Sequence, residues 1–244
     1  MNETFLQGRT ALVTGATRGI GFAIARALAD AGATVAICGR SQDSVDEAVR
    51  RLTNEKQRKV AGKAADVRAS TNVAALFEWI ESEMGGPDIL VNNAGVGIMK
   101  STAELTVEDW RETIETNLSG VFYCSREALL RMKKRGGGYI INVGSLAGKN
   151  AFSGGAAYNA SKFGLSGFTE AMMLDHRHDN VRVSHIMPGS VDTEFSGRGT
   201  SGGSARADWK IAPEDIGEIV LMLLRMPERT LVSQVEVRPA KPRK

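Results

Sequence analysis

Two side chains with complementary chemistry stand four residues apart in the stretch "AAYNASKFG", residues 156 to 164. Tyr158 carries a phenol that can donate a proton, and Lys162 carries an ammonium that can change how readily the phenol gives it up. A spacing of four places both side chains on one face of a helix, about one turn apart. The neighbouring residues are mostly small, which leaves room for a cofactor and a substrate beside the pair.

The chemistry that suits this pair is proton exchange with a carbonyl oxygen. Hydride transfer to a ketone leaves negative charge on the oxygen, so one group must supply a proton and another must stabilise the charge. A unit charge about 4 Å from the phenol, at an effective dielectric near 20, is worth about 4 kcal/mol, or about three pKa units. We therefore expect Lys162 to lower the pKa of Tyr158.

A glycine-rich turn, "TGATRGIG", follows the first apolar run and opens the first helical segment. Its glycines, Gly15, Gly19 and Gly21, allow the backbone to approach a ligand closely, and the helix amino terminus behind them offers N–H groups and a positive dipole end to a pyrophosphate. The spacing is GxxxGxG rather than the common GxGxxG. The alternative is a purely structural turn.

The end of the second apolar run, "AICGRS", indicates which dinucleotide would bind. Arg40 stands where an NAD site usually places an acid for the ribose 2′-hydroxyl. Together with Ser41 and Arg18, it could bind a 2′-phosphate, so NADP is favoured over NAD. The alternative is that both arginines are solvated surface charges.

The elements that must position these groups alternate along the chain. Short runs rich in Val and Ile alternate with segments of helical period, from "TALVTG" to "VRVSHIMPG". Because parallel strands need crossover helices, this predicts an α/β, doubly wound Rossmann-type fold with helices on both faces of a parallel sheet. Helix starts are predicted at Thr106, which forms a capping-box spacing with Asp109, and at Pro213. The length of 244 residues favours a single domain, 1–244.

Two segments interrupt the alternation. Residues 196–208 are rich in Gly and Ser, which is typical of a surface loop or a mobile lid, and we expect a substrate loop over 190–212. Residues 238–244 are expected to form a solvated basic tail.

The composition argues against several classes of protein. The formal charge of +3 does not imply a strongly polyanionic partner. Cys38 and Cys124 lie far apart without a CxxC spacing, which argues against a zinc site or a disulfide framework. His176 and His178 point to different sides of a helix, so no metal site is expected. The tryptophans do not alternate with a basic stripe, and no run approaches the length of a membrane span. We expect a cytoplasmic protein that binds neither nucleic acid nor membrane.

Over nearly its whole length, the chain resembles the short-chain dehydrogenase/reductase family. "TGATRGIG" is similar to the family's glycine motif, Asp66-Val67 to its adenine-contacting pair, "NNAG" to the end of its fourth strand and "PGSVDT" to the turn after its sixth. Four residues resemble its catalytic tetrad in the usual order: Asn117, Ser145, Tyr158 and Lys162.

The resemblance implies a mostly parallel sheet of seven strands and a role for each member of the tetrad. Tyr158 would be the acid and base, Ser145 would bind the carbonyl oxygen, Lys162 would also hold the nicotinamide ribose, and Asn117 would anchor a water. The motifs and the resemblance together imply these cofactor contacts: Gly15, Thr17, Arg18, Gly19, Ile20, Gly21, Arg40, Ser41, Asp66, Val67, Asn93, Ala94, Gly95, Tyr158, Lys162, Pro188, Gly189, Val191 and Thr193.

Partners are suggested by two further patterns. "LLRMKKRGGGYIINVGS" resembles a stretch of 3-oxoacyl-(acyl-carrier-protein) reductases, and its basic residues could dock an acidic carrier protein or complement their own helix dipole: Arg131, Lys133, Lys134, Arg135 and also Arg177. The carboxyl end departs from those reductases. A Gly/Ala stripe lies opposite the Tyr158 face and could meet the chain's own sheet or a second subunit, as the family's dimers and tetramers imply: Ala160, Gly164, Gly167 and Ala171.

The function expected from these patterns is NADP-dependent, reversible reduction of a ketone or 3-oxoacyl-type carbonyl to a secondary alcohol. Its substrate pocket would be formed by residues 98–104, residues 146–157 and the Gly/Ser segment. The alternatives are a dehydrogenase of another alcohol class (sugar, steroid or small alcohol) and a non-catalytic dinucleotide-binding sensor or interaction protein.

Overall fold

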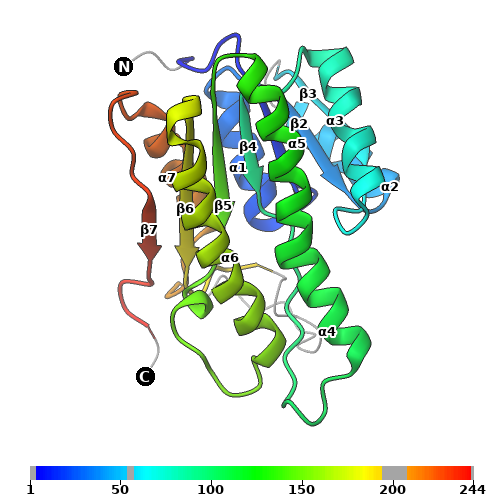
Figure 1. The fold of residues 1–244 in the computed structure, drawn as a ribbon, viewed down its shortest axis with the longest axis vertical. Coiled ribbons are helices and arrows are strands. Elements are labelled where there is room, and N and C mark those ends of the chain that lie inside the picture. Colours follow the sequence, from blue (N-terminus) through cyan, green and yellow to red (C-terminus); the bar gives the residue numbers. More distant parts are fainter. Residues whose placement is uncertain (1–3, 54–57, 194–207, 243–244) are drawn as a thin grey trace.

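The computed structural model describes residues 4–53, 58–193 and 208–242, which are arranged around one parallel sheet (Figure 1). The strand order is β3-β2-β1-β4-β5-β6-β7, and every neighbouring pair is parallel. The strands are β1 (Thr10–Thr14), β2 (Thr34–Gly39), β3 (Val60–Ala64), β4 (Ile89–Asn92), β5 (Gly138–Val143), β6 (Val181–Pro188) and β7 (Gln234–Val237). This confirms the seven-stranded parallel sheet that the sequence and the resemblance predict.

Helices connect the strands as crossovers. The α-helices are α1 (Gly19–Asp30), α2 (Gln42–Thr53), α3 (Ser70–Met84), α4 (Val107–Ile114), α5 (Gly120–Lys134), α6 (Ala156–His176) and α7 (Pro213–Arg225). Three shorter turns are the π-helical η1 (Glu115–Ser119) and the 3-10 helices η2 (Leu146–Gly148) and η3 (Arg177–Asp179). The predicted helix starts are confirmed, because Thr106 and Asp109 form a capping box before α4 and α7 begins at Pro213.

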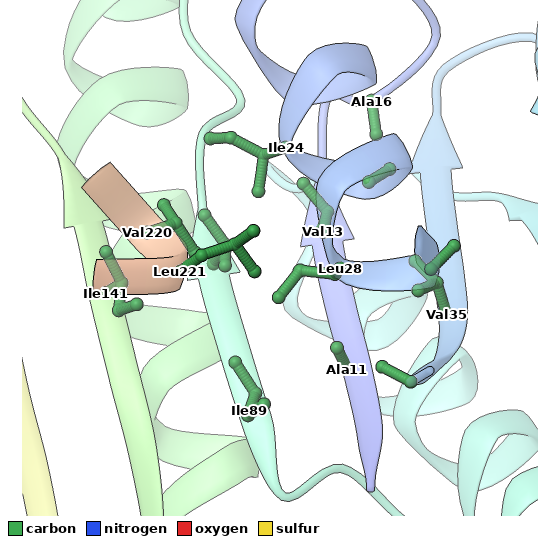
Figure 2. Close-up of a cluster of buried hydrophobic side chains, with 14 of the residues drawn as sticks. Ala11, Val13, Ala16, Ile24, Leu28, Val35, Ile89, Ile141, Val220 and Leu221 are labelled. Carbon is green, nitrogen blue, oxygen red and sulfur yellow. The ribbon is translucent and has the colours of Figure 1, made fainter. Parts of the chain in front are cut away.

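Both faces of the sheet are buried because apolar side chains alternate between two clusters. On β1, Val13 points into a cluster with α1, α2 and α7, whereas Leu12 points into a cluster with α3, α5 and α6. Figure 2 shows the first cluster, in which Ile24 of α1 and Val220 of α7 meet over the sheet. Period-2 alternation in a strand with two covered faces explains the near-continuous apolar runs of the sequence.

The order of connections reverses at β1, which lies between β2 and β4. In a doubly wound sheet, a ligand crevice forms outside the carboxyl ends of the strands at such a switch point. The turns after β1 and β4 lie against each other here, since a Cβ added at Gly15 would lie 2.7 Å from the Cα of Ala94. The fold therefore brings the glycine turn to the "NNAG" segment.

The expected substrate loop is only partly described. Its two ends are joined, because Val191 forms a bridge with Ile211 and the Asp192 N–H donates to the Ile211 carbonyl at 2.9 Å. Residues 194–207 and the last two residues of the basic tail lie outside the described residues, so the loop stays a prediction. None of the helices in the described ranges has the length and hydrophobicity needed to cross a bilayer.

Candidate active site

A cavity of about 590 Å³ lies at the carboxyl edge of the sheet, and most of the predicted site residues border it. Its lining includes Gly15, Arg18, Gly19, Ile20, Asn93, Gly95, Met99, Ser145, Tyr158, Lys162, Pro188, Gly189, Val191 and Thr193. Seven other predicted contacts stand outside this lining. Thr17, Gly21 and Ala94 are sequence neighbours of lining residues, and four follow the ends of β2 and β3: Arg40, Ser41, Asp66 and Val67. The cavity thus unites the catalytic and glycine motifs and leaves the predicted adenosine contacts as a separate group.

The glycine turn at one end of the cavity has the form needed to hold a phosphate. Gly15 and Gly19 have φ angles of 62° and 58°, a left-handed conformation that side chains rarely adopt. Helix α1 starts directly behind them, without a side-chain cap on Arg18 and without an acidic residue in its first turn. The helix amino terminus is therefore open to an anion, and the turn fits the pyrophosphate of a dinucleotide.

The catalytic cluster lies where the turn after β5 meets α6. Tyr158 makes a side-chain hydrogen bond with Ser145, and Lys162, which is 5% exposed, donates from Nζ to the Val143 carbonyl at 3.2 Å. The Nζ atom lies 5.8 Å from the centroid of the Tyr158 ring. Three members of the predicted tetrad are therefore neighbours beside the cavity.

Asn117, the fourth member, lies in the π-helical turn η1, and its side chain joins two segments of the site. Its Oδ1 accepts from the Val96 N–H at 2.8 Å, and its Nδ2 donates to the Val96 carbonyl at 2.9 Å and to Ser161 Oγ at 3.0 Å. Single π turns inside helices often occur at functional sites. The amide here fixes the segment after β4 against α6, and its predicted role of anchoring a water stays a prediction.

Burial dominates the protonation of the Tyr158–Lys162 pair. It raises the pKa of Tyr158 above its usual value, while the hydrogen bond with Ser145 acts in the opposite direction. It also lowers the pKa of Lys162 to about 8. The expected lowering of the Tyr158 pKa is therefore wrong, because loss of hydration outweighs the effect of an amine that is directed at the Val143 carbonyl. At neutral pH the phenol is protonated.

His185 is a neighbour of the site that was not among the residues predicted from the sequence. The register of the sheet places it on β6 opposite Asn142, 3% exposed, and its Nε2 has no hydrogen-bond partner among the described residues. Burial, followed by the charges of Lys162 and Lys149, lowers its pKa to about 4. The signal was present in "VRVSHIMPG", where period 2 puts Val181, Val183 and His185 on one face.

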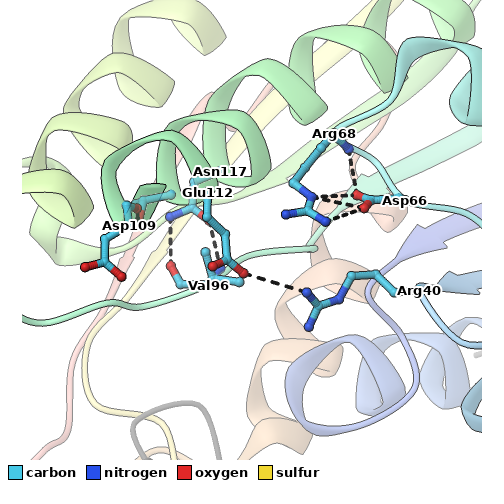
Figure 3. A network of polar contacts seen from close by, with 8 residues as sticks. Arg40, Asp66, Arg68, Val96, Asp109, Glu112 and Asn117 are labelled. Carbon is cyan, nitrogen blue, oxygen red and sulfur yellow. Dashed lines mark hydrogen bonds and ion pairs between the residues drawn. The ribbon is translucent and has the colours of Figure 1, made fainter. Parts of the chain in front are cut away.

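Two of the predicted adenosine contacts, Arg40 and Asp66, belong to a charged group with Arg68 and Glu112 (Figure 3). Arg40 lies at the end of β2 with an exposed side chain, and its Nη1 is 3.7 Å from Glu112 Oε1 on α4. Asp66 follows β3 and is paired with Arg68, whose Nη2 donates to Oδ2 at 2.6 Å. This hydrogen bond is the main cause of a lowered pKa at Asp66. Arg40 is the residue predicted to bind a 2′-phosphate, and in the structure a carboxylate faces its guanidinium.

The basic residues predicted to dock a carrier protein are largely paired with acids. Their ion pairs are Arg131 with Glu81 and Glu127, Lys133 with Asp179, and Arg135 with Asp88. Asp88 directly precedes β4, so this group lies at the amino edge of the sheet, at the opposite end of α5 from the site (Figure 1).

The Gly/Ala stripe of α6 does not pack on the chain's own sheet, which was one of its two expected partners. Ala160, Gly167 and Ala171 are exposed, and a Cβ added at Gly167 would meet nothing within 4 Å. Gly164 is half-buried against the side chain of Leu118.

Known proteins resemble this chain over most of its length. The family model described as short chain dehydrogenase matches residues 9–202. A 3-oxoacyl-(acyl-carrier-protein) reductase of Aquifex aeolicus is 36% identical over 194 residues, which cover 80% of this chain and 78% of the relative. A 3alpha-hydroxysteroid dehydrogenase of Mediterraneibacter gnavus is 35% identical over 191 residues, covering 78% and 76%. The solved alcohol dehydrogenase of the archaeon Thermococcus sibiricus, complexed with 5-hydroxy-NADP, matches with a TM-score of 0.88 at 31% identity, over 97% of this chain and 98% of that one.

Proposed function

The chain belongs to the short-chain dehydrogenase/reductase family, and we propose that it uses NADPH to reduce a ketone or 3-oxoacyl-type carbonyl to a secondary alcohol, reversibly. The observation that carries the proposal is the Tyr158–Ser145 hydrogen bond beside a buried Lys162, in a cavity that starts at an open helix amino terminus. The names of the relatives, a reductase and two dehydrogenases, support the reaction class.

The glycine turn and the strand ends would hold the cofactor, which supplies a hydride when it is bound. Gly15 and Gly19, with their left-handed backbone, would accommodate the pyrophosphate at the start of α1. Thr193 lies over this turn, with its methyl carbon 3.4 Å from the place of a Cβ on Gly19. As the family resemblance implies, it would contact the carboxamide of the nicotinamide. Arg40, Ser41 and Arg18 favour NADP over NAD because they offer two cations and a hydroxyl to the 2′-phosphate.

Tyr158 protonates the substrate oxygen as negative charge develops there. Its raised pKa keeps the proton on the phenol at neutral pH, which suits an acid in the direction of reduction. Ser145 shares the same oxygen and stabilises its charge. Lys162, with a pKa of about 8, can return a proton to the phenolate after the transfer.

The mouth of the cavity favours an apolar carbonyl compound. Met99 borders the cavity and is 48% exposed, and Phe152 is 46% exposed with its ring centroid 6.4 Å from that of Tyr158. Such exposed apolar side chains beside a reactive group would bury against the body of a ketone or acyl chain. The basic group at the amino edge would have to leave its acidic partners before it could dock a carrier protein, so we favour a free substrate.

The proposal is tested by following NADPH absorbance with a panel of ketones and β-ketoacyl thioesters. We expect Tyr158→Phe to reduce turnover about 100- to 10,000-fold, because it removes the proton donor, while NADPH still binds. Tyr123→Phe, on α5, is the matched control and should retain wild-type turnover. Equal slow rates for the wild type and Tyr158→Phe would instead support a non-catalytic dinucleotide sensor.

We also propose that the chain forms a homodimer or homotetramer through α6. The exposed Ala160, Gly167 and Ala171 would let a helix of a second copy approach closely, and Phe163, which is 46% exposed, lies on the same helix. Small residues permit close packing of helices, and exposed apolar side chains supply the driving force.

A further inference from the structure

The cation assigned to the 2′-phosphate already has a partner within the chain. Arg40 directly follows β2 and Glu112 lies on α4, and Figure 3 shows the two side chains facing each other. Their Nη1 and Oε1 atoms are 3.7 Å apart, and the two side chains are 66% and 31% exposed. An exposed pair at this distance is weak, so Glu112 cannot close the site, but it competes for the same guanidinium.

The surrounding charges strengthen this competition. Arg68 is held by Asp66 through paired hydrogen bonds of 3.0 and 2.6 Å, so its guanidinium is already occupied. Glu112 and Glu115 also contribute to a raised pKa at Arg68, and Arg40 contributes to the lowered pKa of Asp66. Two guanidinium groups therefore share one electrostatic cluster with three carboxylates. A 2′-phosphate, with a charge of about −2, would enter a cluster in which the carboxylates already outnumber the guanidinium groups.

We propose that Glu112 is a residue that determines cofactor specificity: it holds Arg40 in the free protein, repels the 2′-phosphate in the complex, and so reduces the preference for NADP over NAD. This inference rests on the proposed NADP site. NAD has a hydroxyl in place of the 2′-phosphate, so neither effect applies to it with the same strength. Loss of an exposed ion pair changes an equilibrium constant about two- to fivefold. Neutralising Glu112 would also remove its repulsion of the 2′-phosphate, so the total change in the dissociation constant of NADP is about tenfold.

The experiment measures the Kd of NADP+ and NAD+ by calorimetry for the wild type, Glu112→Gln, Arg40→Ala and the double variant. We expect Glu112→Gln to tighten NADP+ binding about tenfold and NAD+ binding less than twofold. The gain should shrink as salt is raised, because exposed charges are screened. In the Arg40→Ala background, Glu112→Gln should have a smaller effect, since only the repulsion remains.

The matched control is Glu108→Gln, which removes the same charge at an exposed position one turn earlier on the same face of α4 and should leave the NADP+/NAD+ ratio unchanged. Glu112→Lys is a second variant, expected to shift the ratio further than Glu112→Gln, and thermal melts report that each variant is folded. Equal effects on both cofactors, weaker NAD+ binding in Glu112→Gln, or the same shift in Glu108→Gln would overturn the inference.

The two proposals fail in different ways. If Arg40→Ala weakens NADP+ selectively while Glu112→Gln changes nothing, the NADP site stands and the role of Glu112 is overturned. If the wild type does not bind NADP+, or if Arg40→Ala affects both cofactors alike, the proposed phosphate site fails and the inference fails with it.

Discussion

At the residue scale, burial controls the protonation of the proposed catalytic pair, Tyr158 and Lys162. Sequence spacing identifies Tyr158 and Lys162 and places them on one helix face, but it cannot tell where the lysine amine points. That direction depends on the Val143 carbonyl of β5, which accepts from Nζ at 3.2 Å and comes from a distant part of the chain. A buried ammonium has lost its hydration, so Lys162 lowers the stability of the fold at pH values where it is charged.

Lys162→Met is therefore expected to abolish turnover and to stabilise the protein by about 2 kcal/mol at pH 7. Lowering the pKa from 10.5 to about 8 corresponds to about 3 kcal/mol, and the Val143 carbonyl, which loses its donor, costs about 1 kcal/mol. The folded pKa lies below the unfolded one, so the unfolded chain binds more protons between pH 8 and 10.5, and wild-type stability rises across that window. Urea unfolding of both proteins from pH 7 to 9.5 measures this difference.

The control for this prediction is Lys134→Met, which removes an exposed lysine from the end of α5 and should change stability by less than 0.5 kcal/mol at every pH. A stability difference between the wild type and Lys162→Met that stays constant from pH 7 to 9.5 would show that Lys162 titrates normally.

At the scale of elements, local sequence signals are sufficient to predict where helices and strands lie. The contacts between these elements cannot be predicted from such signals. The alternation of strands and helices, the glycine turn before α1, the cap at Thr106 and the start of α7 at Pro213 all depend on neighbours in sequence, and each is confirmed. The Arg40–Glu112 pair and the place of His185 depend on where α4 stands relative to the residue after β2 and on how β6 pairs with β5. Register and helix position are set by the whole packed sheet, so residue types alone do not predict them.

The turn after β5 illustrates such a contact, because it holds Ser145 and rests on His185 of the next strand. A Cβ added at Gly144 would overlap the imidazole Nε2. We expect Gly144→Ala to lower the free energy of unfolding by about 1 to 3 kcal/mol and to reduce turnover, since the turn that carries Ser145 must move. Thermal unfolding and the NADPH assay measure the two effects.

The variant His185→Ala completes this comparison as a double-mutant cycle. Removing the imidazole frees the space that the new methyl group needs, so Gly144→Ala should cost less in the His185→Ala background than in the wild type. If the unfolding free energies lost in Gly144→Ala and in His185→Ala simply add in the double variant, the contact between this turn and β6 does not limit the geometry of Ser145.

At the scale of the whole molecule, the sheet separates surfaces with different properties. The cavity and its apolar mouth lie at the carboxyl edge, and the paired basic group lies at the amino edge. Between them, α5 and α6 lie side by side on one face, where Phe122 contacts Phe168 with ring centroids 6.1 Å apart (Figure 1). Phe122, Leu130, Phe163 and Leu174 on these helices are each 45% exposed or more. A face with this much accessible apolar surface favours association with another chain.

Gly167→Arg tests whether that association is with a second copy through the stripe of α6. Gly167 has open space where a side chain would stand, so arginine should fit the single chain and leave its circular dichroism unchanged. Between two closely packed helices it would place a bulky charge, and we expect the assembly to dissociate into smaller species in light scattering coupled to size exclusion. Ala75→Arg, at an exposed position of α3, is the matched control and should keep the wild-type mass. A wild type that is monomeric at micromolar concentration, or a Gly167→Arg variant with unchanged mass, would contradict assembly through this stripe.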